Sequence, residues 1–121
     1  DAVTGLCVVM AVEGQWEDAL KRLEAADGMF QHELNYQYNS ACVYSRVVAH
    51  LRKTPDIPDR DTLIERFTGM ALKRLRDAVD SGFSDLNWMQ KDPDLESLRE
   101  SEGFKEILKG RAAPPAEGPR A

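Results

Sequence analysis

The sequence predicts an all-α protein built from two antiparallel helix pairs followed by short capping helices. Apolar residues recur at three- and four-residue spacing through most of the chain, and no segment shows sustained alternation of apolar and polar residues. The pentapeptide Ala-Leu-Lys-Arg-Leu also occurs twice, at 19–23 and at 71–75, and an equivalent alanine follows each copy, Ala26 and Ala78. We therefore expect two related helix pairs, each with one copy of the pentapeptide in its second helix.

The first pair is expected to consist of helices over 2–12 and 15–26. Gly14 separates them, and Gly28 is the expected C-terminal stop because glycine adopts the left-handed conformation at little cost. The apolar stripes expected to face inward are Val3, Leu6 and Val9 or Met10 in the first helix, and Trp16, Ala19, Leu20 and Leu23 in the second.

The second pair is expected over 30–52 and 62–81. Two prolines within 54–59 predict a loop between the helices, because proline cannot continue a helix. Asp59 or Asp61 can cap the second of these helices by accepting bonds from its free N–H groups. The expected buried faces are Leu34, Tyr38, Ala41, Cys42, Ser45 and Val48 in the first helix, and Leu63, Phe67, Ala71, Leu75 and Ala78 in the second.

Short helices complete the predicted domain, which extends over 1–110. Ser84, Asp92 and Ser101 are the expected capping residues, and a proline directly after Asp92 favours a helix start. Gly110 is expected to end the last helix, and the tail 111–121 is expected to be disordered because it has no large apolar residue. The predicted parts are a first repeat at 1–28, a second repeat at 30–82 and a C-terminal cap at 84–109.

Charge and cysteine content exclude several classes of function. The chain has 16 Lys and Arg against 21 Asp and Glu, a net charge of −5, which argues against nucleic-acid binding and against a polybasic membrane contact. Cys7 and Cys42 lie within helical patterns and are expected to fill helix contacts, which favours a reducing compartment and the cytoplasm as the default location. The chain begins at Asp1 within a helical pattern, so we expect it to be part of a larger protein.

Several positions of the first pair match the order of a tetratricopeptide repeat. These positions are Cys7, Gly14, Trp16, Ala19, Leu23 and Ala26. The segment therefore resembles that family, whose small residues let two helix backbones approach closely. Ala41 follows Cys7 by 34 residues, which is the family period, whereas Ala71 follows Ala19 by 52. The difference of 18 residues is interpreted as an insertion, and Phe67 is expected to replace the aromatic that is usual at Thr68.

The remainder resembles the closing segment of bacterial multidomain proteins that end in such repeats, including fused Ser/Thr protein kinases. The resemblance covers about residues 3 to 109 and implies an α-solenoid with a cap at the end of its stack. Its ordered motifs are Tyr38-Asn39-x-Ala41-Cys42-Val43-Tyr44, Ala71-Leu72-x-x-Leu75, Gly82-Phe83-x-Asp85, Asp92-Pro93-Asp94-Leu95-x-x-Leu98-Arg99, Phe104 and Leu108.

No catalytic, cofactor or metal site is predicted. His32 and His50 are too far apart along one helix to act together, and two isolated Cys do not complete a zinc site with them. The acidic positions at 92–94 lack the spaced ligands of a calcium loop and are better explained by helix capping. The basic cluster at 73–76 is explained by ion pairs on a solvated helix face.

A peptide-binding groove is the remaining candidate site. Asn35, Tyr38, Asn39, Cys42 and Arg46 share one helix face, where the Asn amides can bond a peptide backbone and the Arg can bind a carboxylate. In the resemblance, Asn39 matches a common Asn of the first helix of a repeat. The alternative is that Asn39 makes only structural hydrogen bonds and that the groove is shallow.

The expected function is therefore that of a non-catalytic interaction or regulatory module, with any catalytic domain lying elsewhere. Its partner would be a protein or peptide segment, or another domain of the same polypeptide, and neither nucleic acid nor membrane. The alternative is a purely structural cap of a longer helical array with no ligand of its own.

Overall fold

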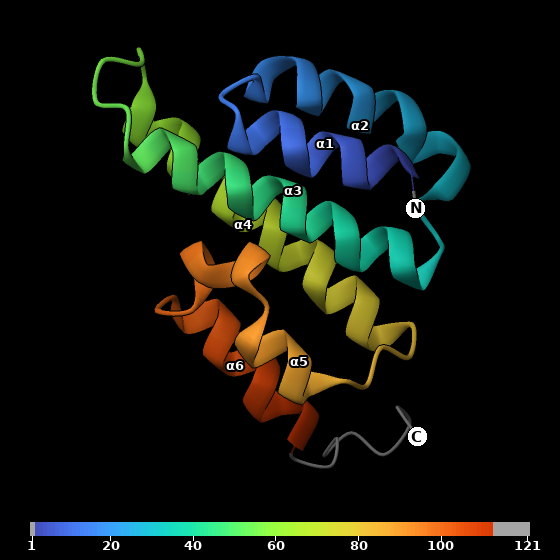
Figure 1. The fold of residues 1–121 in the computed structure, drawn as a ribbon. Coiled ribbons are helices and arrows are strands. Elements are labelled where there is room, and N and C mark those ends of the chain that lie inside the picture. The colour runs from blue at the N-terminus through green and yellow to red at the C-terminus, as the bar shows by residue number, and fades with distance from the viewer. Residues whose placement is uncertain (1, 113–121) are drawn as a thin grey trace.

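The computed structural model describes residues 2–112, and every regular element among them is a helix (Figure 1). The prediction of an all-α protein is confirmed for this part of the chain. None of these helices is both long and apolar enough to cross a lipid bilayer. The elements are α1 (Ala2–Val12), α2 (Trp16–Phe30), α3 (Leu34–Arg52), α4 (Arg60–Asp80), α5 (Leu86–Lys91), the 3₁₀ helix η1 (Pro93–Leu98) and α6 (Glu102–Ala112).

Helix α3 lies at the centre of the molecule. It packs against α1 and α2 on one side and against α4 and η1 on the other, whereas α6 packs against α4 (Figure 1). The sequence predicted a single buried face for α3, but its side chains are buried around most of its circumference. The fully buried members beyond the predicted stripe include Tyr36, Val43 and Val47.

The contact between α1 and α2 is close at the two small residues predicted to allow it. Cys7 and Ala19 are both fully buried, and the Cys7 thiol donates a hydrogen bond of 3.3 Å to the Ala19 carbonyl oxygen. The predicted inner stripe of α1 is wrong at Leu6, which is about half exposed. Of the two alternatives Val9 and Met10, Met10 is the buried one. Helix α1 contains no charged residue, so apolar periodicity could not identify its inner face.

The turn between the two helix pairs lies later than predicted. Helix α2 continues through Gly28 to Phe30, and α3 begins at Leu34 instead of residue 30. Phe30 packs on the ring of Tyr36 with 5.8 Å between ring centroids. This tertiary contact favours the extra helical turn although glycine is a poor helix former.

The proline loop is tied to α3 by Arg60, a role that the sequence did not suggest. The Arg60 Nε donates to the Leu51 carbonyl oxygen at 2.7 Å and its Nη2 to that of Arg52 at 2.9 Å. Helix α4 begins at Arg60 rather than residue 62 and ends at Asp80. Asp59 occupies the N-cap position with a φ of 57° and makes no side-chain capping bond, so the predicted carboxylate cap is wrong there.

Side-chain caps begin the C-terminal elements, although one differs from the prediction. Asp85, not Ser84, caps α5 by accepting a bond of 3.0 Å from the backbone N–H of Trp88. The Asp92 cap is confirmed, since its Oδ1 accepts from the Asp94 N–H at 2.9 Å. The Ser101 cap is confirmed by a bond of 3.2 Å from the Phe104 N–H.

The last helix packs closely against α4. A Cβ added at Gly103 would lie only 2.6 Å from Cδ1 of Leu72, so a glycine allows this approach. Phe104 and Ile107 are buried next to it. Helix α6 does not stop at Gly110 as predicted but runs to Ala112, so the first two residues of the predicted tail are helical. Residues 113–121 of that tail lie outside the described residues.

Gly69 offers a test of the helical assignment of α4. It lies on an exposed face, and a Cβ there would meet nothing within 4 Å. We expect Gly69→Ala to raise the free energy of unfolding by about 0.5–1 kcal/mol, since glycine loses more backbone entropy than alanine. Gly82→Ala should have the opposite effect, because Gly82 has a φ of 119°, a conformation that alanine rarely adopts. It should lower that free energy by about 1 kcal/mol or more, and urea denaturation measures both.

Candidate functional site

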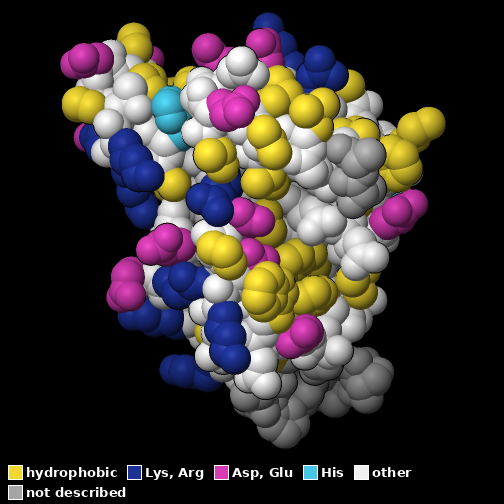
Figure 2. All heavy atoms as spheres, in the orientation of Figure 1, with side chains coloured by type: hydrophobic (Ala, Val, Ile, Leu, Met, Phe, Trp, Pro, Cys, Tyr) yellow, Lys and Arg dark blue, Asp and Glu magenta, His cyan; other side chains and the backbone are white. Residues whose placement is uncertain are grey.

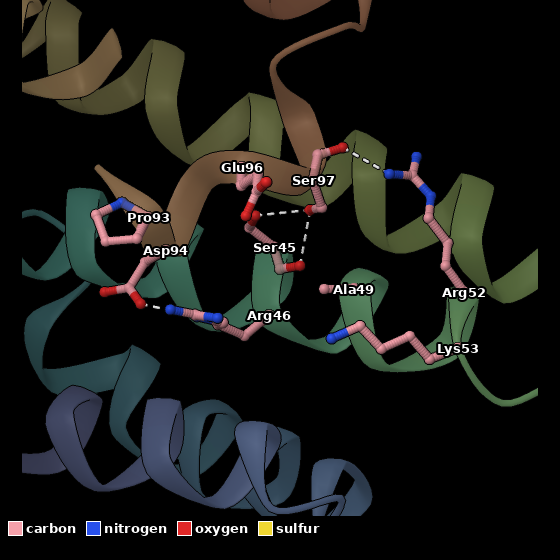
Figure 3. A pocket seen from close by; sticks show the side chains of 9 residues that line it. All are labelled: Ser45, Arg46, Ala49, Arg52, Lys53, Pro93, Asp94, Glu96 and Ser97. Carbon is pink, nitrogen blue, oxygen red and sulfur yellow. Dashed lines mark hydrogen bonds and ion pairs between the residues drawn. The ribbon is translucent and has the colours of Figure 1, made fainter. Parts of the chain in front are cut away.

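Two adjoining cavities lie on the face formed by α1, α3 and η1, and we call them together the groove. They meet at Asp94, which lines both. The first, of about 430 Å³, is shown in Figure 3 and is lined by Ser45, Arg46, Ala49, Arg52, Lys53, Pro93, Asp94, Glu96 and Ser97. The second, of about 300 Å³, is lined by Thr4, Gly5, Val8, Asn39, Cys42 and Asp94.

Three of the five residues predicted to line a peptide groove contact Asp92 or Asp94, and two of these three, Cys42 and Arg46, also line the groove. The Tyr38 hydroxyl donates to Asp92 Oδ2 at 2.7 Å, and its ring stacks on Phe83 at 4.4 Å between centroids. Arg46 Nε donates to Asp94 Oδ1 at 2.8 Å (Figure 3). The Cys42 thiol lies 3.9 Å from Asp92 Oδ2. Arg46, the donor that the sequence assigned to a ligand carboxylate, is therefore already paired with a carboxylate of the chain itself.

The two predicted asparagines are placed differently. Asn39 is half-buried in the second cavity, and its side chain makes no hydrogen bond to another residue of 2–112. Asn35 is exposed and lines neither cavity. A segment bound in the groove could reach the Asn39 amide. Nothing in the structure connects Asn35 with the groove.

The Cys42 thiol and the Tyr38 hydroxyl beneath the groove keep their protons at neutral pH. Burial, then the negative charge of Asp92, raises the pKa of the Cys42 thiol above its ordinary value of 9.0. Burial, then the hydrogen bond to Asp92, raises the pKa of Tyr38 above 10.0. At neutral pH the Cys42 sulfur is a thiol, so it is neither a good nucleophile nor a good metal ligand.

A metal ion does not fit the one cluster of suitable donors found among the described residues. Cys42, Asp92 and Asp94 have donor atoms within 4.8 Å of one another. The carboxylates already accept bonds from Tyr38, from the Asp94 N–H and from Arg46. A metal would have to displace these donors and deprotonate the thiol. We interpret the cluster as the polar link between α3 and the cap.

The buried Cys and Tyr side chains predict a loss of stability at alkaline pH. The pKa values of Cys42, Tyr36, Tyr38 and Tyr44 are all raised, with desolvation by burial as the largest cause. Above the ordinary values of 9.0 for Cys and 10.0 for Tyr, the unfolded chain releases protons that the folded chain retains. The free energy of unfolding should therefore be constant from neutral pH to about 8.5 and fall steadily above it.

Urea denaturation at several pH values measures this effect. Tyr38→Phe removes one of these titrating groups and should make the alkaline decline less steep. A free energy of unfolding that stays constant up to about pH 10.5 would contradict the burial of these groups.

The sequence did not single out Arg52 and Lys53, two of the charged residues of the first cavity. Arg52 donates through Nη1 to the Ser97 carbonyl oxygen at 2.8 Å, and the Lys53 side chain makes no ion pair or hydrogen bond within residues 2–112. Both follow Arg46 and Ala49 at helical spacing, which was the available signal. Without the position of η1, however, nothing in the sequence showed that this face bounds a cavity.

Comparisons with known proteins give a distant relative. No family model matches the chain, and no solved structure matches it. The chain is similar to a protein of Arabidopsis thaliana whose name describes it as chloroplastic, with 30% identity over 99 residues. The match covers 79% of this chain and 24% of that protein, so the chain spans about a quarter of the relative's length.

Proposed function

We propose that this chain is a non-catalytic interaction module of the tetratricopeptide type, which binds an extended segment of a partner protein in the groove. The observation that supports it most is the open groove between α1, α3 and η1, which joins two cavities along the first helices of both pairs and the cap. The residues around it include an amide without a side-chain partner, small side chains and unpaired charges.

The two helix pairs support the tetratricopeptide interpretation. The three apolar residues of the repeated pentapeptide are buried in both copies, with Ala19 and Ala71 fully buried. Trp16 contacts Phe67 edge to face at 6.0 Å between centroids, and Phe67 also stacks near Tyr44. Phe67 thus contacts Trp16, the aromatic residue of the first repeat. This contact supports the interpretation that Phe67 takes the place of the aromatic residue that is usual at position 68. The long α3 and α4 fit the proposed insertion in the second repeat.

A random-peptide phage library offered to the immobilised chain tests the proposal. We expect enriched peptides to bind the chain in solution and to lose affinity in Gly5→Gln. A Cβ at Gly5 would meet nothing within 4 Å, so this side chain can enter the second cavity without strain. Gly69→Gln on the exposed face of α4 is the matched control and should bind normally. Equal binding by both variants, or no enrichment at all, would contradict binding in the groove.

The alternative function, a structural cap of a longer helical array, is favoured by the outer face of α1. Leu6, Val9 and Val12 are 47%, 51% and 55% exposed, and Figure 2 shows hydrophobic side chains gathered over this helix. If α1 normally packs against a preceding repeat, the isolated chain should self-associate. Light scattering that shows a strict monomer at high concentration would argue against this alternative.

The wider context of the module is a prediction from the sequence resemblance. A bacterial source, a fused kinase domain and a cytoplasmic location draw no support from the relative, which is a plant protein named as chloroplastic. The full reading frame upstream of Asp1 would test all three.

A further inference from the structure

We propose that the first cavity of the groove binds acidic side chains, so that the partner segment is an acidic stretch of polypeptide. The proposal rests on the proposed function, because it names the chemistry of the segment that the groove would accept. The residues that would contact its carboxylates are Lys53 and Arg52, at the C-terminal end of α3.

The positions of these two side chains place positive charge inside the cavity. Figure 3 shows Lys53 lying along α3 below Ala49, with its ammonium group toward the Arg46 side of the cavity. The small side chain of Ala49 leaves the floor open between the charged groups. Arg52 lies at the other edge, where one of its N–H groups is used by the Ser97 carbonyl oxygen. Its remaining N–H groups are free to bind a carboxylate.

The three cations of the first cavity differ in whether a carboxylate pairs with them. Arg46 is neutralised by Asp94 at 2.8 Å, whereas neither Arg52 nor Lys53 has a carboxylate partner among residues 2–112. Glu96 is the one unpaired acid of the cavity, and it is exposed on η1. Figure 2 shows Lys and Arg side chains gathered over the C-terminal part of α3.

This local excess of cations is unusual in a chain whose net charge is −5. Such a chain repels acidic polypeptides over most of its surface, so an acidic segment would be attracted only where positive charge is unpaired. The second cavity has a different character, since α1 contributes Thr4, Gly5 and Val8. A segment along the whole groove would therefore place acidic residues at α3 and η1 and small uncharged residues at α1.

Lys53→Glu tests the charge of the cavity with little risk to the fold. Lys53 is exposed, and its side chain makes no hydrogen bond or ion pair that the substitution would remove. Circular dichroism verifies that the helices persist. The wild-type chain and Lys53→Glu are each used to select peptides from the random phage library. Lys73→Glu, which reverses an exposed cation of α4 outside the groove, is the matched control.

The composition of the selected peptides then decides the proposal. We expect the wild-type chain and Lys73→Glu to enrich peptides rich in Asp and Glu, and Lys53→Glu to lose this preference. A synthetic copy of an enriched acidic peptide should bind Lys53→Glu about tenfold more weakly than wild type, and weaken with added salt. Lys53→Arg should keep the affinity within about twofold.

The failure of this inference is distinguishable from failure of the proposed function. Enriched peptides without an acidic bias, selected equally by wild type and Lys53→Glu, would overturn the charge preference and leave binding in the groove intact. If no peptide is enriched by any of the chains, both proposals are overturned.

Discussion

A chain that ends at Lys91 is expected to lose cooperative thermal unfolding. Removing η1 and α6 takes away Leu95, Leu98, Phe104 and Ile107, all of which are buried in the core. Each fully buried side chain of this size contributes about 1.5–3 kcal/mol through removal from water. Their combined contribution approaches the whole stability of a typical domain, about 5–15 kcal/mol. Differential scanning calorimetry of the shortened chain measures the outcome.

A single substitution tests the contribution of the cap to stability without removing any helix. Leu98→Ala should lower the free energy of unfolding by about 2–5 kcal/mol, because it leaves a cavity where the cap meets α3. Trp88→Ala is the control, since Trp88 is 47% exposed and should cost much less. A shortened chain that unfolds with an unchanged midpoint, or a Leu98→Ala chain as stable as wild type, would show that the cap does not close this core.

Arg74→Ala is expected to lower the free energy of unfolding by about 2–3 kcal/mol, because it leaves the partly buried Asp27 carboxylate without its ion-pair partner. Arg74 joins three helices. Its Nη2 donates to Asp27 of α2 at 2.8 Å and its Nη1 to the Ser40 hydroxyl of α3 at 2.9 Å. It also lies 5.9 Å from the ring centroids of Tyr36 and Tyr44. Urea denaturation of the variant gives the magnitude.

Controls separate this network from ordinary surface charge. Lys73→Ala removes the neighbouring cation, which pairs with Asp77 on an exposed face, and should cost less than about 0.5 kcal/mol. In a double-mutant cycle, Asp27→Ala and Arg74→Ala should be strongly non-additive, because each removes the same ion pair. Additive effects would mean that the pair contributes nothing to joining the two helix pairs.

The sequence predicted the helices well where a repeated pattern or a capping residue defined them. The buried apolar residues of the two pentapeptides and the caps at Asp92 and Ser101 follow from local rules, and the structure confirms them. Its errors lie where tertiary contacts decide. Glycine did not end α2 at Gly28, and α1, which has no charged residue, gave no signal for its exposed face at Leu6.

The candidate site was less predictable than the fold. Helical spacing placed Tyr38 and Arg46 on one face of α3, and the structure brings both side chains to the C-terminal cap. Helical spacing could not show that the C-terminal cap would supply carboxylates to both Tyr38 and Arg46. Nor could it show that Lys53, whose sequence neighbourhood is an ordinary helix end, would border a cavity. Both facts depend on how the cap folds back over α3.

Nuclear magnetic resonance mapping of a phage-selected peptide on the isotopically labelled chain tests the proposed function most directly. We expect the largest amide shift changes at Gly5, Asn39, Ala49, Lys53 and Ser97, which come from three separate segments and meet only in the groove. Shift changes confined to the outer surfaces of α2 or α4 would contradict the proposal that this chain recognises its partner there.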